Sequence, residues 1–494
     1  MRKRKYFTCS ILNWIRRKKS STNENIWLTQ KVMAQLYEVT VPTINYHINK
    51  IFKDSELQKD SVIRKFLITA DDGKPYNTNH YSLEMIISLE KGRNNMGERL
   101  IFHVDVNSAF LSWEAVDRLS KGDTLDLRTV PSCVGGDPDK RTSIVSTKSI
   151  PAKKYGVITG EPVATALRKC PELIVVKPNF HLYQKMSHAF KSILNEYTPL
   201  MQSFSIDEVF MDMSGMELLH PDPIKLAHEM KDKIRDELGF TVNVGVANNK
   251  LCAKMASDFE KPDKVHTLFP DEIKDKMWPL PVGELFGCGQ STAKKLQEMH
   301  IKTIGDLALT DERFLLSVFG QKTADYLHYA ANGIDDSPVV NEEREAKSYS
   351  VENTTQDDVT DFDTVNHLLL AEADVVASRL RADEVKAFTI TVIYRTSDMK
   401  RHSHGRKIEN STDITSEIYD IAVDLMKECW KGEPLRLIGL SASDIDRDGF
   451  QQMSLFGEEE KEKQKKLDKA LDSIRNKYGN NSVMRAGIGV FRND

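Results

Sequence analysis

Two adjacent acidic residues in an apolar setting could hold a metal ion. Asp207 and Glu208 lie within the run Ser203 to Phe210, between apolar residues. Burying two carboxylates side by side is costly because their charges repel. A divalent cation removes that repulsion, and Mg²⁺ binds through carboxylates together with substrate phosphates. Taken alone, an Asp-Glu dipeptide is more often a turn with two solvated acids, so the prediction of a metal site needs a second element.

That second element is the apolar run at residues 100–106, which is rich in β-forming residues and contains Asp105 near its end. One buried strand with a carboxylate, and a later strand pair with two more, match a two-metal centre for phosphoryl transfer. Neighbouring residues of a strand point to opposite faces, so both later carboxylates reach one centre only through a hairpin bend. The residues therefore predict nucleotidyl transfer.

Three ordered segments resemble signatures of the Y-family translesion DNA polymerases, and the closest type is the bacterial DNA polymerase IV (DinB-like) branch. The segments are residues 105–110, 149–157 and 205–208, and the resemblance extends over about residues 98–490. It implies a DNA-directed DNA polymerase of low fidelity that acts in DNA repair and damage tolerance. It also implies an α+β multidomain fold shaped like a right hand.

The resemblance implies the domain boundaries as well. The parts expected are a ferredoxin-like palm (residues 96–110 and 178–269), small fingers (111–177), a helix-hairpin-helix thumb (270–336), a linker (337–349), an α/β little finger (350–450), and a tail with a clamp-binding motif and a terminal helix (451–494).

By the same resemblance, Asp105 and Asp207 bridge two Mg²⁺ ions, and Val106 lends a backbone carbonyl. Glu208 is expected nearest the primer 3′-hydroxyl. Phe110 stands where the family has an aromatic steric gate, whose ring leaves no room for a ribose 2′-hydroxyl. Without the surrounding motif, Phe110 would be read as a core aromatic.

The triphosphate is expected to contact Ser108, Ala109, Thr147, Lys153 and Lys261. Residues 144–148 read as a strand that leads into a phosphate-facing loop. The chain departs from the family pattern here, because Ile150 and Lys153 replace the usual Tyr and Arg. Lys153 keeps the charge but loses the bidentate fork of Arg, so triphosphate binding is expected to be weaker or rearranged.

Contacts to DNA and to a partner protein are expected in the second half of the chain. Backbone N–H groups near Gly287 and Gly289 would meet a DNA phosphate without reading sequence. A basic cluster (Lys400, Arg401, Arg406 and Lys407), expected in a loop beyond the strand at 388–395, would lie against the DNA backbone. The short motif Gln452, Met453, Leu455 and Phe456 resembles the peptide that binds the bacterial sliding clamp.

Residues 1–95 have a separate character, with a basic tail followed by a helix-turn-helix-like pattern. Thr29 is expected to cap the first helix and Pro42 to begin the second. The segment resembles the N-terminal part of RhuM-type virulence and phage antirepressor proteins. The pattern leaves two possibilities open, namely DNA binding and a helical pair that serves only packing.

The composition is that of an ordinary folded protein, with 494 residues, 40% hydrophobic and 29% charged, and a net charge of −4. Six scattered cysteines without a metal or redox spacing favour a reduced, cytoplasmic setting. No run of 18 apolar residues and no signal peptide are evident.

The expected partners are primer-template DNA, deoxynucleoside triphosphates and the sliding clamp, for a chain that acts as a monomer. The runner-up function is an inactive polymerase-like regulator that only binds DNA, and it is favoured by the changed fingers motif. A nucleotidyl cyclase on a similar palm is disfavoured by the thumb and little-finger segments.

Overall fold

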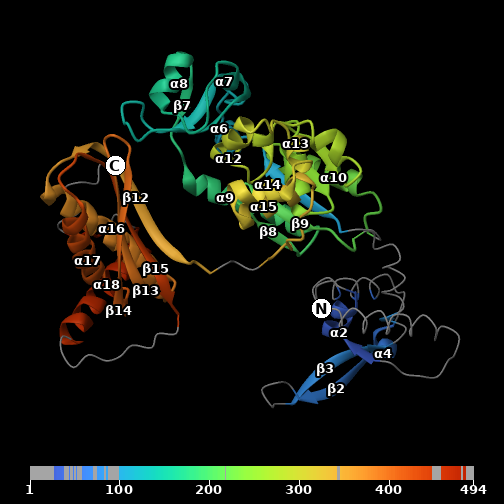
Figure 1. Ribbon diagram of the computed structural model, residues 1–494. Helices are drawn as coiled ribbons and strands as arrows, with labels where there is room; N and C mark the ends of the chain where they lie inside the picture. The colour runs from blue at the N-terminus through green and yellow to red at the C-terminus, as the bar shows by residue number, and fades with distance from the viewer. Residues whose placement is uncertain are drawn as a thin grey trace. The chain divides into compact units, whose positions relative to one another are not determined.

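The computed structural model describes residues 27–37, 44, 48, 52, 58–69, 75–82, 85–86, 99–216, 219–341, 345–447, 458–479 and 482–485 (Figure 1). The chain divides into two compact units. One comprises residues 1–134, 147–156 and 178–342, and the other residues 135–146, 157–177 and 343–494. None of the described helices is long and apolar enough to cross a membrane.

The N-terminal segment forms a small antiparallel sheet of order β1-β3-β2 beside short helices. The elements are β1 (Trp27–Thr29), α2 (Gln30–Tyr37), α4 (Lys59–Val62), β2 (Ile63–Thr69) and β3 (Pro75–Ser82). The Thr29 hydroxyl accepts a hydrogen bond from the Val32 backbone N–H at 3.2 Å, as expected of the cap. Ile44 and Ile48 are helical and buried against this core. Pro42 and most of the second predicted helix lie outside the described residues.

A five-stranded sheet of order β11-β10-β4-β9-β8 carries the acidic residues. Its strands are β4 (Ile101–Val106), β8 (Met201–Ser203), β9 (Glu208–Asp212), β10 (Val242–Ala247) and β11 (Val265–Leu268). Only the β10–β11 pair is parallel among the described pairings of this sheet. Every residue of β4 and β10 is buried, as expected for central strands covered on both faces.

Helices cover this sheet and fix the position of β4. They are α6 (Ala109–Ser120), α9 (Phe180–Asn195), α10 (Pro223–Leu238) and α11 (Lys250–Ser257). Helix α11 packs directly on β10 and β4. The approach requires a glycine, because a Cβ at Gly245 would collide with the carbonyl oxygen of Ala253.

The segment predicted to form the fingers contains a three-stranded sheet of order β6-β5-β7 and two short helices. Its elements are β5 (Ser132–Gly135), β6 (Val145–Lys148), α7 (Ile150–Lys154), α8 (Val163–Lys169) and β7 (Ile174–Val176). The loop predicted after residue 148 is wrong, since α7 begins there. Ser149 caps α7 by accepting from the Ala152 N–H at 3.1 Å, and Pro151 suits the first turn.

The segment predicted to form the thumb is a set of short helices around a shared apolar core. They are a π-helix (η1, Ile273–Met277), a 3-10 helix (η2, Val282–Glu284), α12 (Gln290–Glu298), α13 (Ile304–Ala308), α14 (Glu312–Phe319) and α15 (Gln321–Ala331). The turn before α12 uses Gly287 at φ +81°, which glycine adopts without strain. The Tyr326 hydroxyl braces this turn by donating to the Phe286 carbonyl at 2.5 Å.

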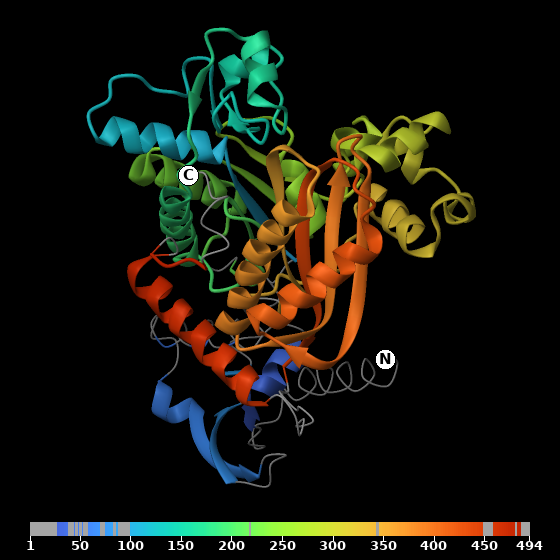
Figure 2. The same cartoon turned by 90° about the vertical axis from the view of Figure 1, so that its left-hand side faces the viewer.

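The segment predicted to form the little finger is an antiparallel sheet of order β12-β15-β13-β14 with two helices on one face (Figure 2). Its elements are β12 (Ser348–Val359), α16 (Phe362–Ala382), β13 (Lys386–Thr396), β14 (Arg401–Thr412), α17 (Thr415–Cys429) and β15 (Leu435–Asp446). The loop predicted for Arg401, Arg406 and Lys407 is wrong, because all three lie on β14. This edge strand pairs with β13 alone among the described strands. Its sequence therefore does not have to alternate between apolar and polar residues.

A terminal helix, α18 (Glu458–Tyr478), is held to α16 by ion pairs. Arg381 of α16 contacts Asp468 at 3.2 Å and Asp472 at 2.6 Å. Asp374 of α16 accepts from Arg475 at 2.7 Å. Asp374 and Asp468 are only 5% and 1% exposed, so these charges depend on one another for compensation.

Candidate active site

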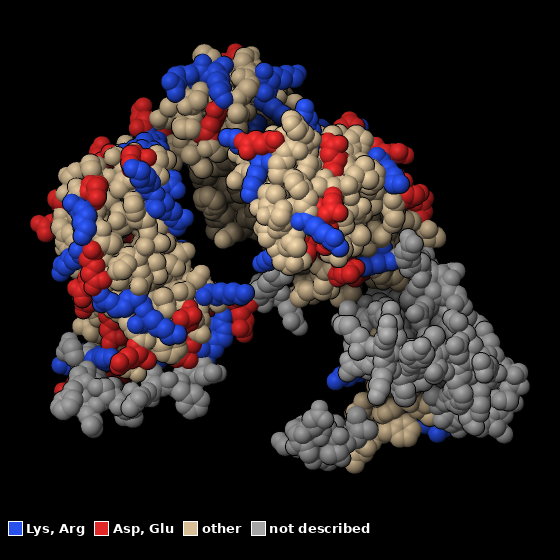
Figure 3. Space-filling view, in the orientation of Figure 1, with Lys and Arg blue, Asp and Glu red and all other residues tan. Residues whose placement is uncertain are grey.

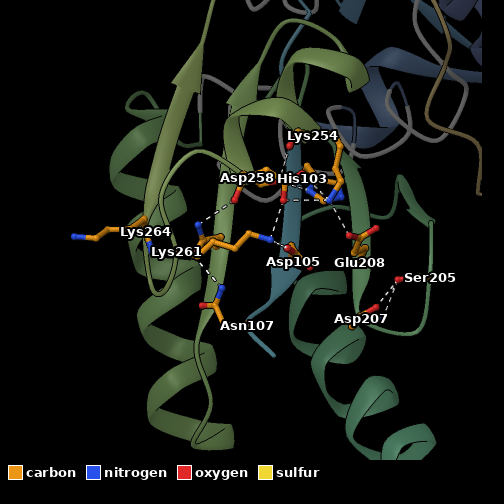
Figure 4. Close-up of polar contacts among 12 residues, drawn as sticks. His103, Asp105, Asn107, Ser205, Asp207, Glu208, Lys254, Asp258, Lys261 and Lys264 are labelled. Atoms are coloured by element: carbon orange, nitrogen blue, oxygen red, sulfur yellow. Dashed lines mark hydrogen bonds and ion pairs between the residues drawn. The ribbon is translucent and has the colours of Figure 1, made fainter. Parts of the chain in front are cut away.

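The acidic residues are brought together where β4, β9 and the bend before β9 meet (Figure 4). Asp105 on β4 lies directly opposite Glu208 on β9, so the two side chains share a face of the sheet. Asp207 sits in the bend between β8 and β9. Its carbonyl accepts from the Val106 N–H at 3.1 Å, which ties the bend to the end of β4. The predicted bend is therefore present.

Each carboxylate has a polar partner of its own. Asp105 forms an ion pair with Lys261, and Glu208 accepts from Lys254 at 2.8 Å. Asp207 is turned toward Ser205, whose hydroxyl donates to it at 2.6 Å (Figure 4). Within the described residues, no three acidic, His or Cys side chains stand together as a metal-binding group. The backbone thus brings Asp105, Asp207 and Glu208 close together, while their side chains interact with two lysines and a serine.

The site balances buried negative charge with buried positive charge. Burial raises the pKa of Asp105 to about 6, although Lys261 and Lys254 oppose the rise. Burial acts to lower the pKa of Lys254 and Lys261, but the neighbouring carboxylates outweigh it and raise both. Burial also holds the pKa of His103 well below its ordinary value, so this ring is neutral beside the Ser257 hydroxyl at 2.8 Å.

The chemistry of this donor set fits a divalent cation. Carboxylates at three neighbouring positions and the backbone carbonyl of Val106 are hard oxygen donors of the kind that Mg²⁺ prefers. A cation here would supply the compensation that the Lys254 and Lys261 ammonium groups give to Asp105 and Glu208. The side chains of Asp105, Asp207 and Glu208 would need to turn from their present partners to share it.

A hydrogen-bond network that the sequence did not predict positions Lys261. The Asn107 side chain accepts from the Asp263 N–H at 2.9 Å and donates to the Asn243 side chain at 3.1 Å. The Asn243 side chain also accepts from the Lys264 N–H at 3.2 Å. The loop after Lys261 is thereby fixed to the end of β4. Lys254 was missed too, although a lysine within an apolar helix is a signal that could have found it.

The Phe110 ring lies in an aromatic cluster at the start of α6. It stacks on Tyr183 of α9 with the ring centroids 4.5 Å apart and the planes 12° apart. The Tyr183 hydroxyl donates to Glu114 at 2.9 Å, and both residues are buried. Burial raises the pKa of Tyr183, so the phenol stays protonated as a donor. Neither Tyr183 nor Glu114 was predicted from the sequence.

The other predicted nucleotide-binding residues differ in burial and in their contacts. Ser108 adopts φ +47° and donates from its hydroxyl to the Lys148 carbonyl at 3.2 Å, next to Thr147 at the end of β6. Ala109 is buried at the first position of α6. Lys153 is exposed on α7, and Ile150 is 52% exposed at the start of the same helix.

The predicted DNA-contacting residues are exposed, except that Arg406 is partly buried. Gly287 and Gly289 lie on the surface before α12. On the little finger, Lys400 pairs with Asp398 at 2.8 Å and Arg401 with Glu352 at 2.6 Å, and Arg406 pairs with Glu428. Basic and acidic side chains are interleaved on the face of this domain that Figure 3 shows. Exposed ion pairs are weak, so a phosphate backbone can compete for these cations.

The predicted clamp-binding residues Gln452, Met453, Leu455 and Phe456 lie outside the described residues.

The stability of the metal-free protein should depend on the protonation of Asp105. The folded pKa of about 6 exceeds the ordinary 3.8, so folding takes up a proton between these values. The free energy of unfolding therefore falls as the pH rises through this window, by at most about 3 kcal/mol. Asp105→Asn should flatten that dependence in urea titrations with a chelator present. If Asp105→Asn and the wild type showed the same pH dependence of stability, the raised pKa of a buried Asp105 would be contradicted.

Comparisons with known proteins match most of the chain. The impB/mucB/samB family model matches residues 104–258, and the model of its C-terminal domain matches residues 346–455. The model of a DNA polymerase-iota thumb domain matches residues 283–335.

Similar curated proteins include the DNA polymerase IV of Clostridium acetobutylicum, which is 45% identical over 78% of this chain and 98% of its own length. That of Acetivibrio thermocellus is 36% identical over 78% of this chain and 97% of its own. Among solved structures, a Y-family DNA polymerase chimera has a TM-score of 0.60 at 26% identity, covering 70% of this chain and 99% of that one.

Proposed function

The chain belongs to the Y family of DNA polymerases, of the DNA polymerase IV type, and we propose that Asp105, Asp207 and Glu208 are its catalytic carboxylates. As a member of that family it is a translesion, DNA-directed DNA polymerase. Its substrates under this proposal are primer-template DNA and deoxynucleoside triphosphates. The observation that carries the proposal is the register of β4 against β9, which sets Asp105 opposite Glu208 with Asp207 beside them.

Two Mg²⁺ ions would be held by Asp105, Asp207, Glu208 and the carbonyl of Val106. When bound, they supply Lewis-acid stabilisation of the attacking and leaving oxygens. Lys261 contributes a fixed positive charge next to Asp105, on a loop tied to the end of β4. We assign this ammonium to the incoming triphosphate. Without the metal, the Lys254 ammonium pairs with Glu208 at 2.8 Å, and Glu208 would exchange this partner for the cation.

Phe110 selects the sugar by exclusion in this proposal. Its ring is backed by Tyr183 and cannot move away easily to admit a 2′-hydroxyl. Ser108, Ala109, Thr147 and Lys153 would complete the nucleotide site. Ile150 carries no hydroxyl, and Lys153 binds a phosphate as a point charge rather than a fork, so the triphosphate is held less tightly than in relatives with Tyr and Arg.

The template duplex would be gripped through its backbone rather than its bases. Backbone N–H groups near Gly287 and Gly289, and the side chains of Lys400, Arg401 and Arg406, are placed on the surface for phosphate contacts. We infer a monomer that works in the cytoplasm and gains processivity from the sliding clamp. The five cysteines within the described residues are free thiols, which supports a reducing compartment.

Primer extension tests the proposal directly. The full chain with Mg²⁺ is expected to extend a primer distributively on an undamaged template and to insert a nucleotide opposite an abasic site. Residues 96–494 should retain this activity if the N-terminal segment is an accessory. If the full chain binds primer-template DNA but extends the primer on neither the undamaged nor the abasic template, the chain acts as a DNA-binding regulator and the proposed function is wrong.

The clamp-binding motif predicts a conditional defect. Alanine at both Leu455 and Phe456 should lower synthesis at least about tenfold when the clamp is loaded, because tethering raises the effective concentration of the polymerase at the primer. Synthesis without the clamp should be unchanged. The measurement is the product length per binding event with and without clamp, and equal losses under both conditions would remove the assignment.

A further inference from the structure

Among its described residues, the small N-terminal sheet packs one face against helices, and the side chains of its other face are wholly or partly exposed. Leu28, Ile63 and Tyr81 belong to or pack against the buried cluster that includes Met33 and Ile48. Side chains alternate along a strand, so their neighbours in sequence project to the opposite side. The sheet is therefore half-buried, and its open face needs a separate explanation.

Four residues from all three strands meet on that open face, and we call them the aromatic face: Trp27, Arg64, Phe66 and His80. Arg64 pairs directly with His80 across β2 and β3. The Arg64 guanidinium lies 4.8 Å from the centroid of the Trp27 ring. Phe66 contacts Trp27 at 6.3 Å and meets His80 edge-on at 4.8 Å. The rings thus form a continuous surface.

The aromatic face is accessible. Phe66 is 42% exposed, Arg64 is exposed, and Trp27 and His80 are partly exposed. Large rings are usually covered in a folded protein because they carry much apolar surface. A group of them on an open sheet is typical of a binding surface.

The charge of this part of the chain indicates the class of ligand. Residues 1–82 contain 15 Lys or Arg and seven Asp or Glu, for a net charge of +8, whereas the rest of the chain carries −12. The described residues of the N-terminal segment include four basic side chains (Lys31, Lys59, Arg64 and Lys65) and one acidic side chain, Asp60. A polyanion is therefore complementary to this segment and not to the chain as a whole.

We propose that the aromatic face binds single-stranded DNA by stacking unpaired bases on Trp27, Phe66 and His80. Arg64 contacts the phosphate backbone or stacks beside the bases. Rings on an open sheet with adjacent cations are how proteins hold single strands without sequence preference. A duplex offers no unstacked base to such a surface, so the expected ligand is the unpaired template strand. This binding goes beyond the polymerase activity and does not depend on the metal site.

The test is fluorescence anisotropy of the full chain with a labelled thymidine oligonucleotide, at two salt concentrations. Phe66→Ala and Arg64→Ala should each weaken binding about fivefold or more, because stacking on one ring is worth at least that factor. Leu67→Ala is the matched control, since Leu67 is a neighbouring apolar residue that is 68% exposed on the opposite face of the same strand. It should bind as the wild type does.

Two outcomes would overturn the proposal. One is that Phe66→Ala and Arg64→Ala both bind the oligonucleotide as tightly as the wild type. The other is that they dissociate a dimer seen by size-exclusion chromatography with unchanged DNA binding, which would make the aromatic face an interface between two copies. Thermal melting of each variant checks folding, and primer extension on a short template should stay at the wild-type rate.

Discussion

Asp105→Asn and Asp207→Asn are each expected to lower primer extension by about 10³-fold or more. Both changes keep the size of the side chain and remove the negative charge that a divalent cation needs. Metal ions contribute several kcal/mol of transition-state stabilisation, and each 1.4 kcal/mol is a factor of ten in rate. Single-turnover extension on a primed template measures the effect without interference from DNA release.

Asp212→Asn is the matched control for this experiment. Asp212 is the acid at the other end of β9 from Glu208, paired across the sheet with Ile101. Its loss should change the rate little. Binding of primer-template, measured by anisotropy, should survive in all three variants. Near-normal extension by Asp105→Asn or Asp207→Asn would show that the catalytic carboxylates lie elsewhere.

Phe110→Ala is expected to raise the use of ribonucleotides roughly 10–200-fold relative to deoxynucleotides, the range typical of one added or removed group in a pocket. Tyr183→Leu should raise it in the same direction but less. The reason is that the Tyr183 ring stacks on Phe110 at 4.5 Å and is itself held by Glu114. Without that support, the Phe110 ring can move away from the sugar.

The measurement is the ratio of kcat/KM for a deoxynucleotide to that for the matching ribonucleotide. Tyr183→Phe is the control, because it keeps the stacked ring and loses only the hydrogen bond to Glu114. It should discriminate between sugars nearly as well as the wild type. A merely structural role of Tyr183 would lower both values of kcat/KM together, and an unchanged ratio in Tyr183→Leu would reject the positioning role.

Much of the fold was predictable because its elements repeat strong local patterns. The α+β multidomain polymerase fold is confirmed by the likeness to the solved chimera at a TM-score of 0.60. The strand predicted at 100–106 is β4 (Ile101–Val106), and the strand predicted at 388–395 lies within β13 (Lys386–Thr396). Runs of β-branched residues leave little choice of structure.

The wrong predictions share a physical cause. Arg401, Arg406 and Lys407 lie on β14, whose sequence is polar because an edge strand exposes much of its surface. Helix α7 is five residues long, with Ser149 as its cap and Pro151 in its first turn, and both residue types also favour turns. In both places the hydrophobic period was too short or too weak to reveal the element.

The carboxylate positions could be predicted, but their partners could not. Asp105 and Lys261 are 156 residues apart, and Phe110 and Tyr183 are 73 apart in the chain. Contacts over such separations depend on how β4, α9 and α11 pack together. A motif fixes the type and place of a residue, whereas its supporting side chains are chosen by the tertiary fold.

The ion pairs between α16 and α18 make the C-terminal helix necessary for the stability of the segment before it. Because Arg381 and Asp374 form ion pairs with α18, a chain that stops before Glu458 would remove the opposite charge from both residues. Breaking such a pair costs about 3–5 kcal/mol. In the sequence, the proposed clamp-binding motif therefore precedes a helix on which the charges of α16 depend, so the residues that follow the motif are not dispensable. Substitutions within the motif can therefore test its function without a loss of stability. Truncation of the chain or fusion at this point would instead destabilise the little-finger segment.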